Sequence, residues 1–111
     1  MSKKYQIKVS KRADGEIEQI VEYYRRTGSD EVADNDKSDI QLAINKLETF
    51  PEARPKFPGT EKNPRNIRYT KAWSYKVIYQ IYKEYLRLRV LTVRHDKESP
   101  EAILKDLPPG K

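Results

Sequence analysis

The residues best suited to chemistry lie in the second half of the chain, where cationic side chains alternate with apolar ones. Arg68, Lys71, Lys76 and Arg94 can stabilise negative charge, and His95, the single histidine, can exchange protons near neutral pH. Strands that bury one face and carry lysine and arginine on the other present a positively charged surface. This stretch therefore predicts a surface that meets a polyanion or an acidic protein.

The composition excludes several other kinds of site. The 111-residue chain contains no cysteine, which excludes disulfides, thiolate catalysis and cysteine-based zinc sites, and a single histidine excludes a histidine-rich metal site. No apolar run approaches the roughly 18 residues that a membrane span needs, and no signal-peptide core follows the polar first residues. We therefore expect a cytoplasmic protein with no cofactor, no metal and no membrane partner.

The charge of the chain is unevenly distributed. Residues 30–50 contain six acidic and two basic side chains, whereas residues 51–111 contain seven acidic and fourteen basic ones. This asymmetry favours an oriented interaction with an anionic partner, although the solvated faces of an ordinary globular domain would explain it equally well. At this length we expect one domain, residues 1–111, with a modest core.

Periodicity predicts the elements that must position these residues. Residues 5–9 alternate between apolar and polar side chains, as in a half-buried strand, and Ser10 can cap a helix whose apolar stripe covers residues 13–24. A short connection leads to a second helix, whose apolar stripe covers residues 40–50 and which a proline ends. The acidic opening of this helix, residues 30–39, is rich in weak helix formers, and we expect its first turns to fray or form a loop.

Three strands and a short terminal helix are predicted in the remainder of the chain. The strands follow a proline-rich loop and cover residues 66–70, 75–82 and 85–95. Ser99 can cap a short C-terminal helix, and we expect the last four residues to be loose. The order β-α-α-β-β-β predicts an α+β fold, in which an N-terminal strand and an antiparallel helical hairpin pack on a small, mostly antiparallel four-stranded sheet.

The last two predicted strands differ in how their apolar residues are arranged. In the first of them, Tyr75 and Tyr79 share one face, which is more typical of core tyrosines than of a stacking platform. In the last strand, strict alternation places Val90 and Val93 on opposite faces, so that both faces are apolar. This pattern indicates a central position in the sheet.

This order of elements, together with four sequence motifs, resembles the RelE/ParE superfamily of bacterial toxins, the plasmid-stabilisation proteins of type II toxin–antitoxin modules. The motifs are Ile-Lys-Val-Ser at 7–10 before an Ile-Val-Glu-Tyr-Tyr helix core, Leu-Glu-Thr-Phe-Pro-Glu at 47–52, Tyr-Lys-Val-Ile-Tyr-Gln-Ile at 75–81 and Val-Leu-Thr-Val-Arg-His at 90–95. They span about residues 5–100. The resemblance covers the superfamily and does not choose between its branches.

The resemblance implies growth inhibition by one of two activities, neutralised by a cognate antitoxin. RelE-like members cut messenger RNA on the ribosome without a metal, whereas ParE-like members poison DNA gyrase. By resemblance, Lys76 stands where nucleolytic members place a strand arginine, Arg68 and Lys71 lie near their lysine-rich preceding strand, and Arg94 and His95 lie at the cationic end of the last strand. In-line attack by a 2′-hydroxyl needs such charges at the phosphate and a proton acceptor.

Two departures from the nucleolytic pattern favour the ParE-like branch. No tyrosine follows Tyr85, and Asp96 and Glu98 bring acids to a segment that is basic in nucleolytic members. The alternatives are a ribosome-dependent mRNA endonuclease, a catalytically inactive homologue that binds an antitoxin and regulates its operon, and an independent RNA-binding domain. The enzymatic character of the protein therefore stays open at this point.

Four single residues admit two interpretations each. His95 either hydrogen-bonds to nearby backbone or contacts substrate, and Trp73 either packs over the edge of a hairpin or stacks on a base. Arg87 and Arg89 are either solvated or contact an acidic antitoxin.

Overall fold

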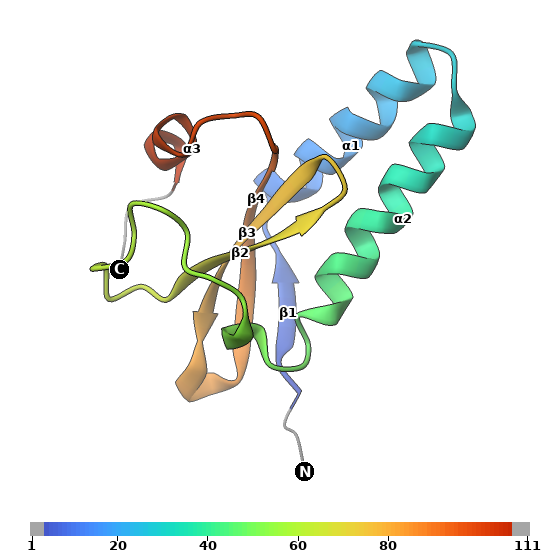
Figure 1. Cartoon of the computed structure of the whole chain (residues 1–111). Coiled ribbons are helices and arrows are strands. Elements are labelled where there is room, and N and C mark those ends of the chain that lie inside the picture. The colour runs from blue at the N-terminus through green and yellow to red at the C-terminus, as the bar shows by residue number, and fades with distance from the viewer. Residues whose placement is uncertain (1–3, 108–111) are drawn as a thin grey trace.

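A four-stranded sheet forms the centre of the structure, a computed structural model that describes residues 4–107 (Figure 1). The strand order is β1-β4-β3-β2, with β1 parallel to β4 and the other neighbours antiparallel. The strands are β1 (Gln6–Val9), β2 (Ile67–Ala72), β3 (Tyr75–Tyr82) and β4 (Arg87–His95). The predicted α+β fold is confirmed, including the central position of the last strand. The four C-terminal residues predicted to be loose lie outside the described residues.

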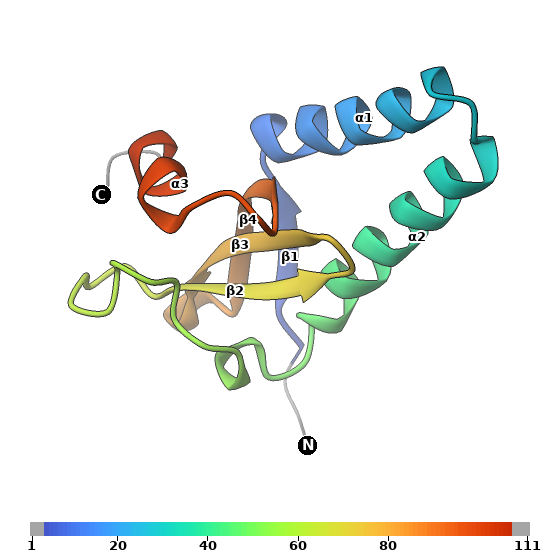
Figure 2. The same cartoon turned by 45° about the horizontal axis from the view of Figure 1, so that its top comes forward.

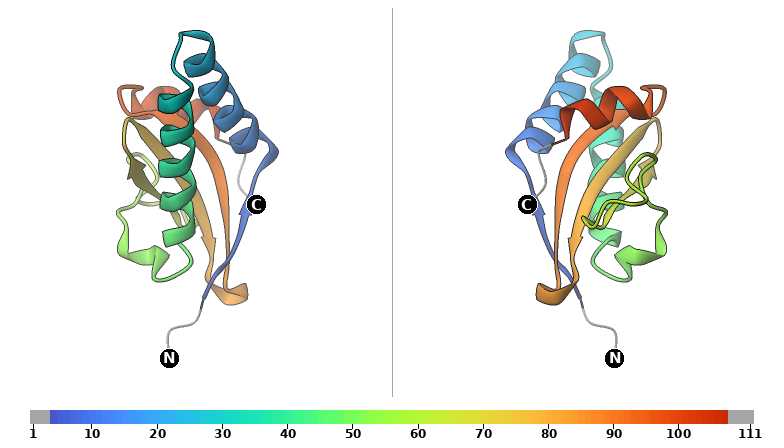
Figure 3. Two further views of the ribbon diagram at one scale, coloured as in Figure 1. Left: turned by 90° about the vertical axis from the view of Figure 1, so that its right-hand side faces the viewer. Right: turned by 90° about the vertical axis from the view of Figure 1, so that its left-hand side faces the viewer.

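Helices cover both faces of this sheet (Figure 3). On one face, α1 (Lys11–Arg26) and α2 (Asp30–Lys46) form an antiparallel hairpin, and on the other lies the short helix α3 (Pro100–Asp106). Two 3-10 helices, η1 (Pro51–Ala53) and η2 (Lys83–Tyr85), lie in the connections. Within residues 4–107, no helix is long and apolar enough to cross a membrane.

Two serines cap the helices of the hairpin at their N-termini. The Ser10 hydroxyl accepts a hydrogen bond of 3.1 Å from the backbone N–H of Ala13, and the Ser29 hydroxyl accepts one of 3.1 Å from that of Val32. Between the helices, Gly28 has a φ of 104°, a value that glycine adopts without strain. The tight connection forces α2 to run back along α1.

The prediction that residues 30–39 would fray is wrong, because α2 runs unbroken from Asp30 to Lys46. The Ser29 cap and the acidic side chains of the first turn stabilise the positive end of the helix, which offsets the low propensity of the aspartates. A buried stripe also fixes the helix against the sheet and α1. Its members are Ala33, Asp36, Ile40 and Ile44.

The second helix also ends earlier than predicted. It stops at Lys46 with Leu47 as its C-cap, whereas the apolar stripe was expected to reach Phe50. Phe50 instead has a φ of 53° and is 69% exposed, and the next residue begins η1. The left-handed backbone at Phe50 turns the chain before the proline does, so the aromatic side chain leaves the core.

The core has two parts, one on each face of the sheet. The larger part lies between the sheet and the helical hairpin and includes Tyr75 and Tyr79, which are 6% and 0% exposed, as predicted for core tyrosines. The hydroxyl of Tyr79 donates a 2.6 Å hydrogen bond to the carbonyl of Pro51. The smaller part fixes α3 and the proline-rich loop to the opposite face. It consists of Phe57, Ile67, Ile78 and Ile103.

A β-bulge in β4 overturns the predicted alternation of that strand. Ile78 pairs with Thr92 but Tyr79 pairs with Val90, so Leu91 is an extra residue. Val90 and Val93 consequently both pack on the helical hairpin, whereas the sequence predicted opposite faces. The strand also begins at Arg87 and not at residue 85, because η2 lengthens the turn before it.

Trp73 forms the tip of the hairpin between β2 and β3, and its exposure contradicts the first of its two interpretations, packing over the hairpin edge. Ala72 pairs with Tyr75, so Trp73 and Ser74 form a two-residue turn. The Trp73 side chain is 76% exposed and its φ is 61°. In this left-handed conformation, the tight turn directs the indole away from the sheet.

Candidate functional site

Three of the predicted site residues lie side by side across the sheet. Lys71 on β2 pairs with Lys76 on β3, which in turn pairs with Arg94 on β4. Alternation places all three on the face that carries α3, where the ammonium group of Lys76 lies 5.8 Å from the centre of the Tyr69 ring. The antiparallel register of the three strands therefore assembles a cluster that residues 23 positions apart in the sequence could not form locally.

Asp96, directly after β4, lies between the two lysines. The Nζ of Lys71 is 3.1 Å from Oδ2 of Asp96, and the Nζ of Lys76 is 4.0 Å from Oδ1. The hydrogen bond from Lys71 lowers the pKa of Asp96 below its usual range, and the nearby charge of Lys76 acts in the same direction. Both lysines therefore share one carboxylate as their counterion.

Arg94 is surrounded by three further carboxylates. Its guanidinium forms a two-pronged ion pair with Glu98, and its Nη2 is 3.0 Å from Oδ2 of Asp106 on α3. Its Nη1 is 4.0 Å from Oε2 of Glu16 on α1. The bond to Glu98, together with that to Asp106, raises the pKa of Arg94 despite its burial. The arginine thus ties α3 to the sheet and α1.

Glu16 is a site residue that sequence reasoning missed. Its carboxylate accepts hydrogen bonds of 2.7 and 2.8 Å from the Thr92 hydroxyl and one of 3.0 Å from the backbone N–H of Val93. The pairing of β1 with β4 ends at Val90, so β1 offers no acceptor to the backbone N–H of Val93. The carboxylate of Glu16 supplies that acceptor. Nothing in the sequence marks this glutamate among the other acids of α1, because its partners Thr92 and Val93 lie 76 and 77 positions away.

His95 lies on the other face of the sheet end. Its ring packs edge-on against Tyr75, with centroids 5.5 Å apart, and its Nδ1 accepts a 3.1 Å hydrogen bond from the backbone N–H of Lys97. The neutral ring consequently carries its proton on Nε2, which has no hydrogen-bond partner within residues 4–107. The histidine is exposed and separate from the lysines, although it follows Arg94 directly in the sequence.

Arg68 does not join either group. It pairs with Tyr79 across the strands, which places it on the face opposite Lys71. Its Nη1 donates a 2.6 Å hydrogen bond to the carbonyl of Arg54, and its Nε donates one of 2.9 Å to the side-chain oxygen of Asn66. These bonds fix the proline-rich loop to β2. The five predicted residues therefore form one cluster of three and two separate positions.

The electrostatic balance of the cluster decides which chemistry it supports. Three cations, Lys71, Lys76 and Arg94, are matched by four carboxylates, those of Asp96, Glu98, Asp106 and Glu16. A phosphate that approaches Arg94 would compete with the carboxylates of Glu98, Asp106 and Glu16. Among residues 4–107, no group of three or more histidine, cysteine or acidic side chains could hold a metal ion. The cluster is therefore an ion-paired network in which Arg94 is the most enclosed cation.

Two solved structures resemble this fold closely. The chromosomal ParDE toxin–antitoxin system of P. aeruginosa superposes with a TM-score of 0.65 at 14% identity, over 82% of this chain and 95% of that one. The RelBE2 toxin–antitoxin complex of Mycobacterium tuberculosis superposes with a TM-score of 0.60 at 14% identity, over 86% of this chain and 95% of that one. At such low identity these likenesses concern the fold alone. No curated protein matches the sequence.

The family is shown by the sequence itself. Residues 7–100 match the model of the ParE toxin of the type II toxin–antitoxin system, parDE. The matched segment runs from the second residue of β1 past the end of β4 and contains the carboxylates of Glu16, Asp96 and Glu98, although not Asp106. The chain therefore belongs to the ParE toxin family of type II toxin–antitoxin systems.

Proposed function

We propose that this ParE-family toxin inhibits DNA gyrase and does not cut messenger RNA. The observation that carries the proposal is the ion pairing of Arg94 with Glu98 and Asp106, because it withdraws the strongest phosphate ligand of the predicted nuclease set. Arg68, which holds the proline-rich loop, is engaged elsewhere. Membership of the ParE toxin family supports the same target.

A direct comparison of the two activities tests this proposal. Purified protein is added to bacterial DNA gyrase with relaxed plasmid and, separately, to ribosomes programmed with messenger RNA. We expect loss of supercoiling in the first reaction and intact messenger RNA in the second. Cleavage in the ribosomal A site without any effect on supercoiling would refute the proposal.

We further propose that a cognate antitoxin, encoded beside the toxin gene, binds and neutralises this protein in the cytoplasm. The solved neighbours are a ParDE system and a RelBE2 complex, both toxin–antitoxin pairs. The exposed Arg87 and Arg89 of β4 are available to an acidic antitoxin. Expression of the toxin alone should arrest growth, and co-expression of the neighbouring gene should restore it. Normal growth of cells that express the toxin alone would instead indicate an inactive regulatory homologue.

The second candidate function is a RelE-like, metal-independent mRNA endonuclease. The observation in its favour is the pairing of Lys71 and Lys76 beside a single carboxylate, together with the unpartnered Nε2 of His95. This candidate predicts A-site cleavage that His95→Ala or Lys76→Ala abolishes. The two residues lie on opposite faces of the sheet end, so only a substrate wrapped around that end could contact both.

A further inference from the structure

We propose that the tip of the β2–β3 hairpin, with the neighbouring part of α2, is the surface by which this protein binds its target enzyme. We name it the hairpin-tip surface and define it by Trp73, Leu42, Lys46 and Arg54. The inference rests on the proposed function and adds the contact surface to it. The occupant is a protein, the DNA gyrase of the proposed function, and the recess fits a surface with an apolar side chain at its centre and carboxylates around it.

The backbone at Trp73 is the first observation. In two-residue β-hairpins, the first turn position favours glycine when its φ is positive, and a bulky side chain there is strained. Trp73 has a φ of 61°, yet its side chain is 76% exposed and contributes little to the core. The fold therefore retains an unfavourable residue without a packing benefit, which is typical of residues kept for function.

The surroundings of Trp73 are the second observation. The tip of the hairpin lies beside α2 in both views of the molecule (Figures 1 and 2). There Trp73 and Leu42, which is 55% exposed, line a recess of about 370 Å³ together with Ala43 and Ala72. Single exposed apolar residues are ordinary, but a tryptophan and a leucine from two elements at one recess resemble the anchors of protein interfaces.

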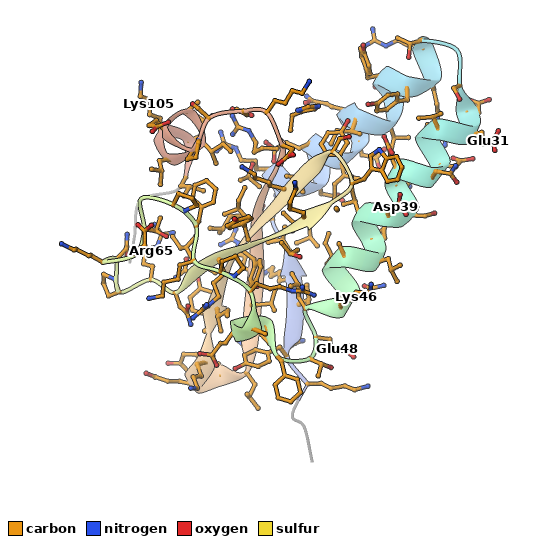
Figure 4. The ribbon with its side chains drawn as sticks, viewed as in Figure 1. Glu31, Asp39, Lys46, Glu48, Arg65 and Lys105 are labelled. Carbon is orange, nitrogen blue, oxygen red and sulfur yellow. The ribbon has the colours of Figure 1, made fainter. Side chains whose placement is uncertain are left out.

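The charge around the recess indicates the chemistry of the partner. Three cations line it, of which Lys71 is paired with Asp96, whereas Lys46 and Arg54 form no ion pair within residues 4–107. Asp39 is the one acid in the lining. Asp39 and Lys46 both project from α2 (Figure 4). Two unpaired cations favour carboxylates at the rim of the partner. A nucleic-acid strand would need a longer cationic track and a second stacking ring, and Leu42 provides neither.

Phe50 offers a matched control for the experiment. It is also an exposed aromatic residue with a positive φ, 69% exposed with a φ of 53°, but it does not line the recess. Glycine at either position accepts the left-handed backbone. Trp73→Gly and Phe50→Gly therefore remove similar strain and similar exposed area, and they differ in whether they alter the hairpin-tip surface.

The test is a titration of supercoiling inhibition with the full-length wild type and both variants, alongside thermal unfolding. We expect Trp73→Gly to lose potency by at least about 30-fold, as for a central anchor, with an unfolding temperature equal to or above that of the wild type. Phe50→Gly should retain wild-type potency. Leu42→Gln, which keeps the helix and removes the apolar contact, should lose about 5-fold.

Several outcomes would overturn the inference. Wild-type potency of Trp73→Gly would leave the gyrase proposal intact and exclude this surface, whereas an inactive wild type would refute both. A lower unfolding temperature of Trp73→Gly would assign the residue a structural role. Retained inhibition with lost binding to the neighbouring antitoxin, to single-stranded RNA, or to a second copy in light scattering would assign the surface to that partner instead.

Discussion

Two adjacent regions of this protein differ in whether their charged and aromatic side chains have partners within the fold. At the charged end of the strands, Arg94 and its neighbouring lysines are matched by carboxylates from α1, α3 and the chain after β4. At the hairpin-tip surface, Trp73 is exposed on a strained backbone, and Lys46 and Arg54 beside it have no ion pair within the described residues. Satisfied groups stabilise the fold, whereas unsatisfied ones remain available to a partner. The abundance of cations alone therefore does not locate the functional surface.

The largest expected effect is a loss of stability when the ion pairs of Arg94 are removed. Arg94→Ala leaves the carboxylates of Glu98, Asp106 and Glu16 close together without their shared cation. Because the pairs are only partly buried, we expect a loss of about 2 kcal/mol in the free energy of unfolding. Urea denaturation measures it, with Arg94→Lys as the control that keeps one charge. A loss below about 0.5 kcal/mol would show that the network is not structural.

The opposite change in stability is expected at the hairpin tip. Trp73→Gly removes a tryptophan with a left-handed backbone conformation from the turn and loses little buried area. We therefore expect the free energy of unfolding to rise by about 1 kcal/mol. The same urea denaturation gives the value, and Trp73→Ala, which keeps a Cβ in the strained conformation, should show no such gain. A destabilised glycine variant would mean that the indole supports the fold after all.

A smaller effect, which depends on pH, is expected at Asp96. Lys71 lowers the pKa of this carboxyl in the folded state, so its ionised form adds stability above the unfolded pKa, near 3.9, and this stability disappears as the pH falls. Asp96→Asn should therefore unfold at a lower temperature than the wild type at pH 6 and at the same temperature at pH 2. An unchanged difference across this range would show that the ion pair with Lys71 does not stabilise the fold.

The smallest effect is expected at Asp36, an acid of α2 that is 7% exposed. Burial, together with the nearby Asp39, raises the pKa of Asp36 in the folded state. The fold therefore favours the protonated form, and stability is lost as the pH rises through the folded pKa. Asp36→Asn should raise the unfolding temperature slightly at pH 7, and the gain should vanish at pH 3. Lower stability at pH 7 would reveal a favourable partner for the carboxylate.

Local pattern alone was enough to predict most of the fold. Ser10, the 3.6-residue stripe of α1 and the strict alternation of β3 determine their elements through neighbours in the sequence, and the structure confirms them. The bulge at Leu91 and the full length of α2 were not predictable in this way. The bulge depends on which residues of β3 and β4 face each other, and the acidic start of α2 is held by burial against other elements.

Residue types and their spacing were sufficient to establish the family, the order of elements and the presence of a cationic strand region. Which carboxylates pair with those cations depends on how the elements pack. Asp106 and Glu16 come from α3 and α1, far from Arg94 in the sequence, and ion pairs between distant segments follow from packing and not from local pattern. The exposure of Trp73 was likewise decided by one backbone angle in a two-residue turn.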